Sequence, residues 1–171
     1  MAAVGERVEW LALADRVELA GYSSYADTPC IYRRGDIFVS PTYSEGFSNT
    51  ILEAMASGLP VVSTRVVGVV DCLEDGRNSL LVEPRDAGAL ALAIGRLLDD
   101  APLRRDLATR ALDDVRTLYS WPAVARTIEG VYEEVADDPV DDSWTGLYDA
   151  QTATVATADL SCRFRAQPHL L

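Results

Sequence analysis

Short apolar runs of strand length alternate with stretches of helical spacing in the first half of the chain. We expect strands at residues 17–21, 36–40, 60–64 and 79–82. Strands that alternate with helices are typical of an α/β domain with a parallel, Rossmann-like sheet. The runs at residues 37–39 and 61–62 are apolar at consecutive positions, which predicts strands that are buried on both faces.

Four helices are expected in the other stretches, each begun by a side chain that can cap it. The expected caps are Asn49 or Thr50, then Asp86, Asp100 and Ser120. The first of these helices should end at Gly58, and Asp75 with Gly76 should form a turn. Apolar residues recur at helical spacing from residue 90 to residue 135, so the C-terminal part of the domain is expected to be helical.

Length and composition predict one folded domain followed by a tail. The chain has 171 residues, of which 49% are hydrophobic, enough to bury a core. After residue 136 the apolar periodicity stops, and the sequence becomes rich in aspartate and then in threonine and alanine. We therefore expect a folded domain at residues 1–136 and a disordered tail at residues 137–171.

The charge and the reactive side chains exclude several classes of function. A net charge of −12 opposes binding to DNA or RNA, which requires clustered cations. The chain has no lysine, which excludes P-loop and Schiff-base lysine chemistry, and its one histidine, His169, lies next to the C-terminus. The three cysteines, Cys30, Cys72 and Cys162, form no zinc motif and fit a reduced, cytoplasmic protein. No apolar run is long enough to cross a bilayer.

Residues 45–53 are the strongest candidate for a binding site. They follow an expected buried strand and run into a helix, so N–H groups of the helix start should lie at the edge of the sheet where anions such as phosphate bind. Glu45 and Glu53 flank this anion site, about 12 Å apart if the whole segment is helical. That span suits a ligand with a diphosphate in the middle and hydroxyl groups at both ends. A G-x-G-x-x-G motif is absent from the sequence, which argues against a dinucleotide site.

Glu53 also has a structural interpretation. Thr50 and Glu53 have the spacing of a capping box, in which Glu53 would accept a hydrogen bond from the N–H group of the cap residue. From spacing alone the structural role is favoured about two to one over ligand binding, because most helices have caps and few have sugar sites. Glu45 has no comparable structural explanation.

Several motifs around these two carboxylates are those of a known enzyme family. Glu45 and Glu53 form an E-x7-E pattern, accompanied by D-I-F-V-S-P at residues 36–41 and L-E-A-M-A-S-G-L-P-V-V at residues 52–62. Further motifs are D-R-V at residues 15–17, E-D-G at residues 74–76 and S-W at residues 120–121. Over residues 6–135 the chain resembles the retaining glycosyltransferases of the GT-B fold, of the group 1 or family 4 type.

The resemblance implies transfer of a hexosyl group from a nucleotide sugar to an acceptor hydroxyl, with retention of configuration. The nucleotide sugar is a substrate, and neither a metal nor another cofactor is expected. Glu45 would be the catalytic carboxylate that contacts the donor sugar, and Glu53 would hold the ribose hydroxyls, so that its ligand role is now favoured. Backbone amides of residues 47–50 would meet the diphosphate. The implied donor-binding residues are Gly46, Phe47, Ser48, Asn49, Thr50 and Glu53.

The chain departs from the family pattern because it resembles only the later part of the C-terminal, donor-binding domain. The acceptor-binding N-terminal domain, the first two strands of the donor domain and the family's basic phosphate ligand have no counterpart in the sequence. In the strand order 3-2-1-4-5-6, the absent strands would lie between the strands at residues 17–21 and 36–40. We therefore expect an unpaired strand edge and a chain that is weakly active or inactive alone. It would be a truncated chain, a fragmentary gene product, or a module for which a second chain supplies the absent parts.

Alternatives to a competent transferase remain open. The same motifs fit a non-catalytic remnant that binds a nucleotide sugar, or an interaction module completed by another chain. Arg33, Arg34 and Arg65 are candidates to replace the absent phosphate ligand, although isolated surface arginines are common. A signalling receiver domain would need an aspartate at the end of its central strand, whereas Asp36 lies at a strand start. Nucleic acid is not an expected partner, and peripheral membrane association is expected only through the absent parts.

Overall fold

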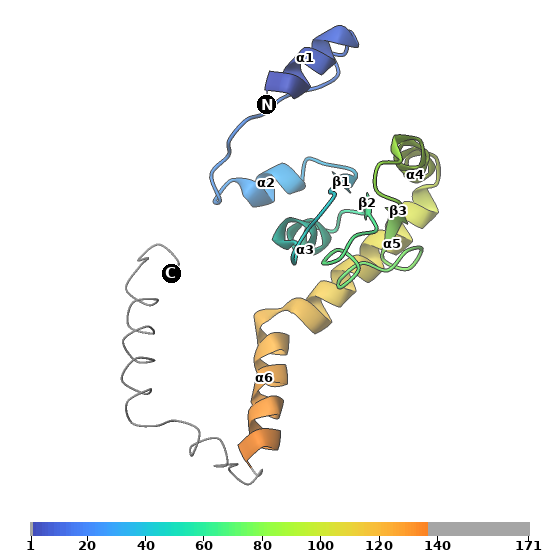
Figure 1. Cartoon of the computed structure of the whole chain (residues 1–171). Helices are drawn as coiled ribbons and strands as arrows, with labels where there is room; N and C mark the ends of the chain where they lie inside the picture. The colour runs from blue at the N-terminus through green and yellow to red at the C-terminus, as the bar shows by residue number, and fades with distance from the viewer. Residues whose placement is uncertain (1, 137–171) are drawn as a thin grey trace, which may run out of the picture. The chain divides into compact units, whose positions relative to one another are not determined.

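A computed structural model describes residues 2–136 of the chain (Figure 1). The tail expected at residues 137–171, with Cys162 and His169, lies outside the described residues. The helices and strands are α1 (Ala2–Trp10), α2 (Thr28–Tyr32), β1 (Phe38–Ser40), α3 (Asn49–Ala56), β2 (Val61–Thr64), β3 (Ser79–Val82), α4 (Ala87–Asp99), α5 (Ala101–Asp114), the π-helical turn η1 (Val115–Tyr119) and α6 (Trp121–Ala136). The chain divides into two compact units, one ending at Ala125 and the other beginning at Arg126, inside α6.

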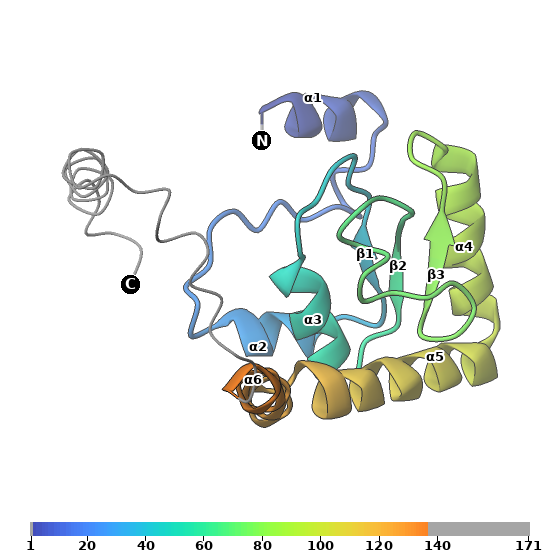
Figure 2. The ribbon, with the colours of Figure 1, turned by 60° about the horizontal axis from the view of Figure 1, so that its bottom comes forward.

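The three strands form a parallel sheet in the order β1-β2-β3, which confirms the α/β class. Val39 pairs with Val62, and Val62 pairs in turn with Leu80. All four residues of β2 are buried, as the run of consecutive apolar positions predicts for a strand with helices on both faces. The same prediction for residues 37–39 is wrong, because β1 is an edge strand among the described strands and its residues are only half-buried. Figure 2 shows α3 on one side of the sheet and α4 on the other.

The core is built from two layers of side chains, one on each face of the sheet. Val61 and Leu81 pack against α3, whereas Val62 and Leu80 pack against Leu97 of α4. This division follows from the strand geometry, since neighbouring residues of a strand point to opposite faces. α5 contributes to both layers and so closes one end of the sheet.

The aspartates expected to cap two of the helices do so. Asp86 accepts a hydrogen bond from the N–H group of Ala89 at 2.8 Å, and Asp100 accepts one from Leu103 at 2.9 Å. Each bond satisfies one of the N–H groups that lack a partner within the first turn of a helix. The starts of α4 and α5 are therefore fixed by local sequence, as predicted.

The prediction of a strand at residues 17–21 is wrong. This segment forms no regular structure, Val17 and Leu19 are exposed, and no described segment pairs with it. A strand requires a neighbour to bond its N–H and C=O groups, and apolar composition alone does not supply one. The five-residue helix α2 and the turn η1 were not predicted from the spacing of apolar residues.

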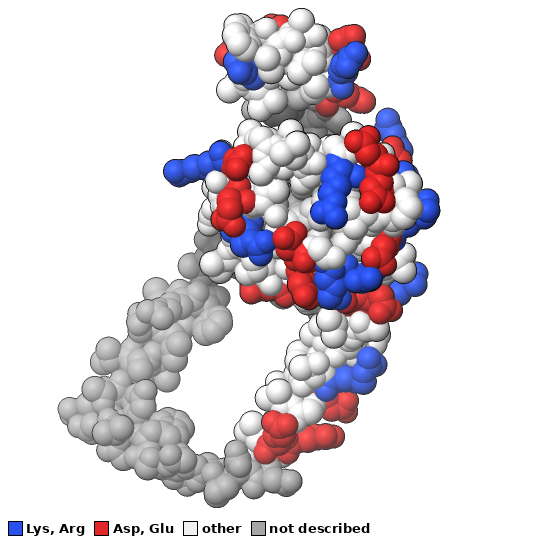
Figure 3. Space-filling view, turned by 90° about the vertical axis from the view of Figure 1, so that its right-hand side faces the viewer, with Lys and Arg blue, Asp and Glu red and all other residues white. Residues whose placement is uncertain are grey.

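The charged side chains form mixed clusters on the surface. On the face drawn in Figure 3 acidic and basic side chains are interspersed. Arg65 pairs with Asp75 at 3.2 Å and with Glu83 at 3.3 Å, all three being largely exposed. Within the described part of the chain, no helix has the length and apolar content to span a membrane.

Asp114, at the end of α5, anchors the loop that precedes β3. Its carboxylate accepts two hydrogen bonds from Arg77, at 2.7 and 3.1 Å, and one from the amide of Asn78 at 2.7 Å. Asn78 is fully buried, and the same amide also donates to the carbonyl of Cys72 at 3.1 Å. Burial alone would raise the pKa of Asp114, but the bonds from Arg77 and Asn78 and the guanidinium charge outweigh it, so the pKa is lowered.

Replacing Asp114 by alanine should lower the free energy of unfolding by about 3 kcal/mol, because Arg77 and the buried Asn78 lose a charged partner. Since the pKa of Asp114 is lower in the folded state, its contribution is present above the unfolded pKa and is lost as the pH falls through the folded value. Urea denaturation of wild type and Asp114→Ala at neutral and acidic pH measures both effects. The difference between the two proteins should therefore shrink below about pH 4.

Asp106→Ala is the matched control, because it removes a carboxylate from the same helix. Asp106 pairs with Arg110 at 2.9 Å, with both side chains about half exposed. Its loss should cost only about 0.3 kcal/mol. Equal losses in the two variants would contradict the role assigned to Asp114.

Candidate functional site

The loop between β1 and α3 carries the expected site, and its first residues are tied to β2. Ser63 donates a hydrogen bond to the carbonyl of Ser40 at 2.8 Å, and Thr64 donates one to the carbonyl of Thr42 at 2.5 Å. These bonds hold the loop at the carboxyl ends of β1 and β2. Ligands of parallel α/β domains bind at this edge of the sheet.

The next part of the loop is in backbone contact with the segment that follows β2. Gly68 has φ +84°, and a Cβ atom placed there would lie 1.4 Å from the carbonyl oxygen of Gly46. It would also lie 2.6 Å from the carbonyl oxygen of Glu45. Only glycine permits both this backbone conformation and this approach, so Gly68 fixes the position of Glu45 and Gly46.

A ring contact holds the same loop from the C-terminal side. The rings of Phe47 and Tyr119 lie 5.9 Å apart between centroids. Tyr119 is the last residue of η1, and its hydroxyl donates to the carbonyl of Asp71 at 3.0 Å. Tyr119 therefore connects the loop of Phe47 with the segment that contains Gly68.

The start of α3 keeps N–H groups that no side chain caps. The cap residue is Ser48 rather than Asn49 or Thr50, so the expected cap is wrong. Ser48 is 3% exposed, and its hydroxyl lies 3.1 Å from that of Thr50 and bonds none of the helix N–H groups. The positive end of the helix is thus available for an anion.

Glu53 is not part of a capping box. Because the helix begins after Ser48, Glu53 is the fifth residue of α3 instead of the third residue after a cap. Its carboxylate oxygen Oε2 accepts a hydrogen bond from the hydroxyl of Tyr32 at 3.1 Å. Burial, the hydrogen bond to Glu53 and the charge of Glu53 raise the pKa of Tyr32 to about 12. The structural interpretation of Glu53 as a cap is therefore wrong.

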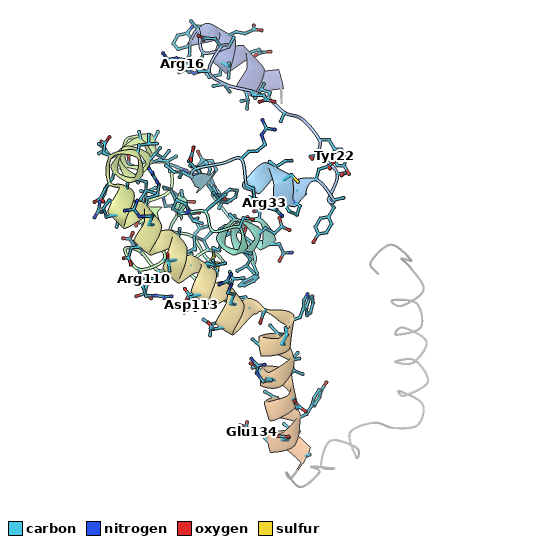
Figure 4. The ribbon with its side chains drawn as sticks, turned by 180° about the vertical axis from the view of Figure 1, so that it is seen from behind. Arg16, Tyr22, Arg33, Arg110, Asp113 and Glu134 are labelled. Atoms are coloured by element: carbon cyan, nitrogen blue, oxygen red, sulfur yellow. The ribbon has the colours of Figure 1, made fainter. Side chains whose placement is uncertain are left out.

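Glu53 lies at the wall of a hollow between α2 and α3. The hollow has a volume of about 420 Å³, within the range of small-molecule sites. Its lining residues are Tyr25, Thr28, Pro29, Tyr32, Arg33, Glu53, Ala56 and Ser57. Arg33, labelled at the end of α2 in Figure 4, forms no ion pair with a described residue. A phenol, a carboxylate and a guanidinium thus line one space large enough for a nucleoside-sized ligand.

The other predicted residues lie along the loop and the helix start, outside this lining. Residues 46–50 run from the Gly68 contact to the first turn of α3. Glu45 is half-buried, and its carboxylate bonds to no side chain in the described part of the chain. The structure therefore places Glu45 and Glu53 on either side of the helix start, but it does not bring both into one hollow.

Sequence reasoning missed Tyr32 and the contact made by Gly68. Asp27 followed by Pro29 is a helix-start pattern that predicts α2, and Tyr32 is the last residue of that helix. Nothing in the sequence signals that its hydroxyl meets a residue 21 positions later. Of the three arginines considered for phosphate binding, Arg33 lines the hollow and Arg65 is engaged in surface ion pairs.

Gly68→Ala should lower the free energy of unfolding by about 3 kcal/mol, because it combines an unfavourable backbone conformation with the clash against Gly46. Gly76→Ala is the matched control, since Gly76 has φ +72° and no atom within 4 Å of the added Cβ. In Gly76→Ala the free energy of unfolding should fall by only about 1 kcal/mol, the cost of the unfavourable backbone conformation alone. Urea midpoints measure both, and a smaller loss for Gly68→Ala than for Gly76→Ala would contradict the contact.

Comparison with curated proteins finds similar sequences that are much longer. The chain is 33% identical over 126 residues to the D-inositol 3-phosphate glycosyltransferase of Corynebacterium diphtheriae. That alignment covers 74% of this chain but only 29% of the relative. The chain thus spans less than a third of the length of this relative.

Solved structures resemble the chain over most of its length. The C-terminal domain of a glycosyl transferase group 1 family protein from Francisella tularensis superposes with a TM-score of 0.65 at 30% identity, over 70% of this chain and 62% of that one. Anabaena Alr3699/HepE in complex with UDP superposes with a TM-score of 0.72 at 25% identity, over 78% of this chain and 36% of that one.

The family assignment rests on a match to residues 2–100. These residues match the family described as "Glycosyl transferases group 1". The match contains both carboxylates, the loop between β1 and α3, and all three strands. Because it covers more than half of the 171 residues, the chain belongs to the group 1 glycosyl transferases.

Proposed function

We propose that residues 1–136 form part of the donor-binding domain of a retaining glycosyltransferase that moves a hexosyl group from a nucleotide sugar to an acceptor hydroxyl. Membership of the group 1 family supports the activity, and the likeness to a solved C-terminal domain supports the placement. UDP bound to one solved structural neighbour supports a nucleotide sugar as the donor. The chain covers only 29% of its curated relative, so the activity of the whole relative is carried to this chain only as part of the proposal.

The observation that carries the proposal is the position of Glu53 in the hollow, one turn beyond an uncapped helix start. In the proposed complex the Glu53 carboxylate accepts hydrogen bonds from the ribose hydroxyls. The base lies in the hollow beside Tyr25 and Tyr32, and the diphosphate lies against the first N–H groups of α3. Arg33 is the described cation at this hollow and supplies charge for the phosphates.

Glu45 is proposed as the carboxylate that contacts the donor sugar. It precedes the helix start, whereas Glu53 follows it, so the two carboxylates meet opposite ends of a nucleotide sugar whose diphosphate lies at α3. Gly68 sets the backbone of Glu45, and the side chain has no described partner that competes with a ligand. The donor-binding residues Gly46, Phe47, Ser48, Asn49 and Thr50 form the connection between the two ends.

The proposed reaction exchanges one bond at the anomeric carbon for another. The bond from the anomeric carbon to the phosphate oxygen breaks, the bond to the acceptor oxygen forms on the same face of the sugar, and the hydroxyl proton of the acceptor passes to the departing diphosphate. N–H groups at the start of α3 stabilise the charge that develops on that diphosphate. Glu45 stabilises the positive charge on the sugar ring. The proposal includes no metal ion or other cofactor.

A binding module without catalysis of its own is the second candidate. β1 has no neighbour on its outer edge among the described strands, and its residues are only half-buried. An open strand edge accepts further strands by hydrogen bonding. In this form the chain binds the nucleotide sugar, and a second chain supplies the acceptor site and the remaining strands.

Glu53→Ala should weaken the binding of UDP to the full chain at least tenfold, because the ribose hydroxyls lose charged hydrogen bonds worth about 1.5 kcal/mol. Calorimetry with UDP, and with GDP if UDP does not bind, measures the dissociation constants. Glu134→Ala is the matched control, because Glu134 is an exposed glutamate of α6 outside the hollow (Figure 4). Unchanged affinity in Glu53→Ala, or equal loss in both variants, would overturn the assignment.

Glu45→Ala should separate sugar binding from nucleotide binding. The variant should bind UDP within about twofold of wild type, because Glu45 lies outside the hollow. The extra affinity of UDP-glucose over UDP should disappear, because the sugar hydroxyls lose their acceptor. The same calorimetric titrations decide this, and parallel losses for UDP and UDP-glucose would contradict the role of Glu45.

A further inference from the structure

We propose that Tyr32 is a positioning residue, whose hydroxyl fixes the Glu53 carboxylate so that its second oxygen meets the ribose hydroxyls of the donor. The inference rests on the proposed function and deepens it by naming what makes the site selective for a ribose. Tyr32 and Glu53 lie in the wall of the same hollow. Their side-chain oxygens are 3.1 Å apart.

The ring of Tyr32 is held by its own helix, by a ring on β1 and by the core layer beneath α3. Tyr32 ends α2, and its ring lies 5.7 Å from that of Phe38 on β1, at 57° between the planes. Both rings pack against the core layer that includes Ile51 and Met55 of α3. α2, β1 and the core face of α3 therefore fix the position of the hydroxyl, and the Glu53 side chain, on the opposite face of α3, takes its orientation from it.

The direction of the hydrogen bond is set by chemistry. The pKa of Tyr32 is raised to about 12, so the phenol keeps its proton at neutral pH and donates it. An ionised carboxylate only accepts, and one oxygen of Glu53, Oε2, is the partner of the phenol. The other oxygen, Oε1, bonds to no described residue and remains for the ribose hydroxyls.

The carbonyl of Thr50 is a competing acceptor, 3.2 Å from the same hydroxyl. One hydroxyl proton forms one strong bond at a time, and a bond to an ionised acceptor is roughly twice as strong as a bond to a neutral one. Tyr32 therefore favours Glu53. If it bonded only Thr50, its hydroxyl would serve the fold and would not affect which sugar the site accepts.

Tyr32→Phe tests the inference in the full chain, because it removes only the hydroxyl. Calorimetry should show about fivefold weaker binding of UDP, the loss of one hydrogen bond, and unchanged binding of 2′,3′-dideoxy-UDP. Tyr32→Phe combined with Glu53→Ala should bind no more weakly than Glu53→Ala alone, since the two groups act as a unit. Tyr132→Phe, which removes the hydroxyl of an exposed tyrosine of α6, is the control and should bind both nucleotides as wild type does.

The outcomes separate the inference from the proposed function. If the wild-type chain binds neither UDP nor GDP, the proposed function fails and the inference fails with it. If wild type binds but Tyr32→Phe loses the same factor for UDP and the dideoxy nucleotide, or if the losses of Tyr32→Phe and Glu53→Ala add, only the inference is overturned.

A measurement without ligand tests the contact itself. NMR titration of ¹³C-labelled tyrosine rings should show a lower pKa of Tyr32 in Glu53→Gln than in wild type. The substitution removes the carboxylate charge and the bond to it, which are two of the three causes of the raised pKa. An unchanged pKa of Tyr32 would show that the hydroxyl bonds Thr50 instead, and would overturn the positioning role.

Discussion

Burial of one face of α3 determines where the chemistry of this domain can lie. Ile51, Ala54 and Met55 are each 0% exposed and occupy neighbouring positions on the helix surface. A helix with one face packed against a sheet cannot rotate about its axis without exposing that face. Glu53, between these residues in sequence, is therefore directed away from the sheet and toward α2, where its carboxylate meets Tyr32. The rotation of α3 about its axis thus determines both which residues enter the core and where the Glu53 carboxylate lies.

The loop before α3 is placed by contacts that come from distant parts of the chain. Gly68 touches its backbone at Gly46, and Tyr119 packs against the ring of Phe47. Together they hold the loop from two sides, so the helix start is presented at the carboxyl edge of the sheet without a side chain to cap it. A rigid arrangement of uncapped N–H groups suits an anion because no reorganisation is needed when charge develops there.

Features that depend on neighbouring residues were predictable from the sequence. The caps Asp86 and Asp100 bond residues three positions away, and the apolar run of β2 reflects burial on both faces, whereas β1 is only half-buried. The failures have non-local causes. Residues 17–21 are apolar enough for a strand but have no described partner, and the cap of α3 is the buried Ser48 rather than Asn49 or Thr50. The Tyr32–Glu53 bond joins residues 21 positions apart, so no spacing signals it.

The start of α3 at Asn49 changes how the spacing between Glu45 and Glu53 is interpreted. If the whole segment from Glu45 to Glu53 were helical, both carboxylates would lie on one straight helix. Instead α3 begins at Asn49, so only the last four steps, about 6 Å of rise, are helical. The preceding residues form a loop whose path is fixed by the contact with Gly68. Seven intervening residues therefore consist of a pinned loop and one helical turn, with the uncapped N–H groups between them. A ligand that reaches both carboxylates must pass its most negative part across the positive end of α3, which is the order of groups in a nucleotide sugar.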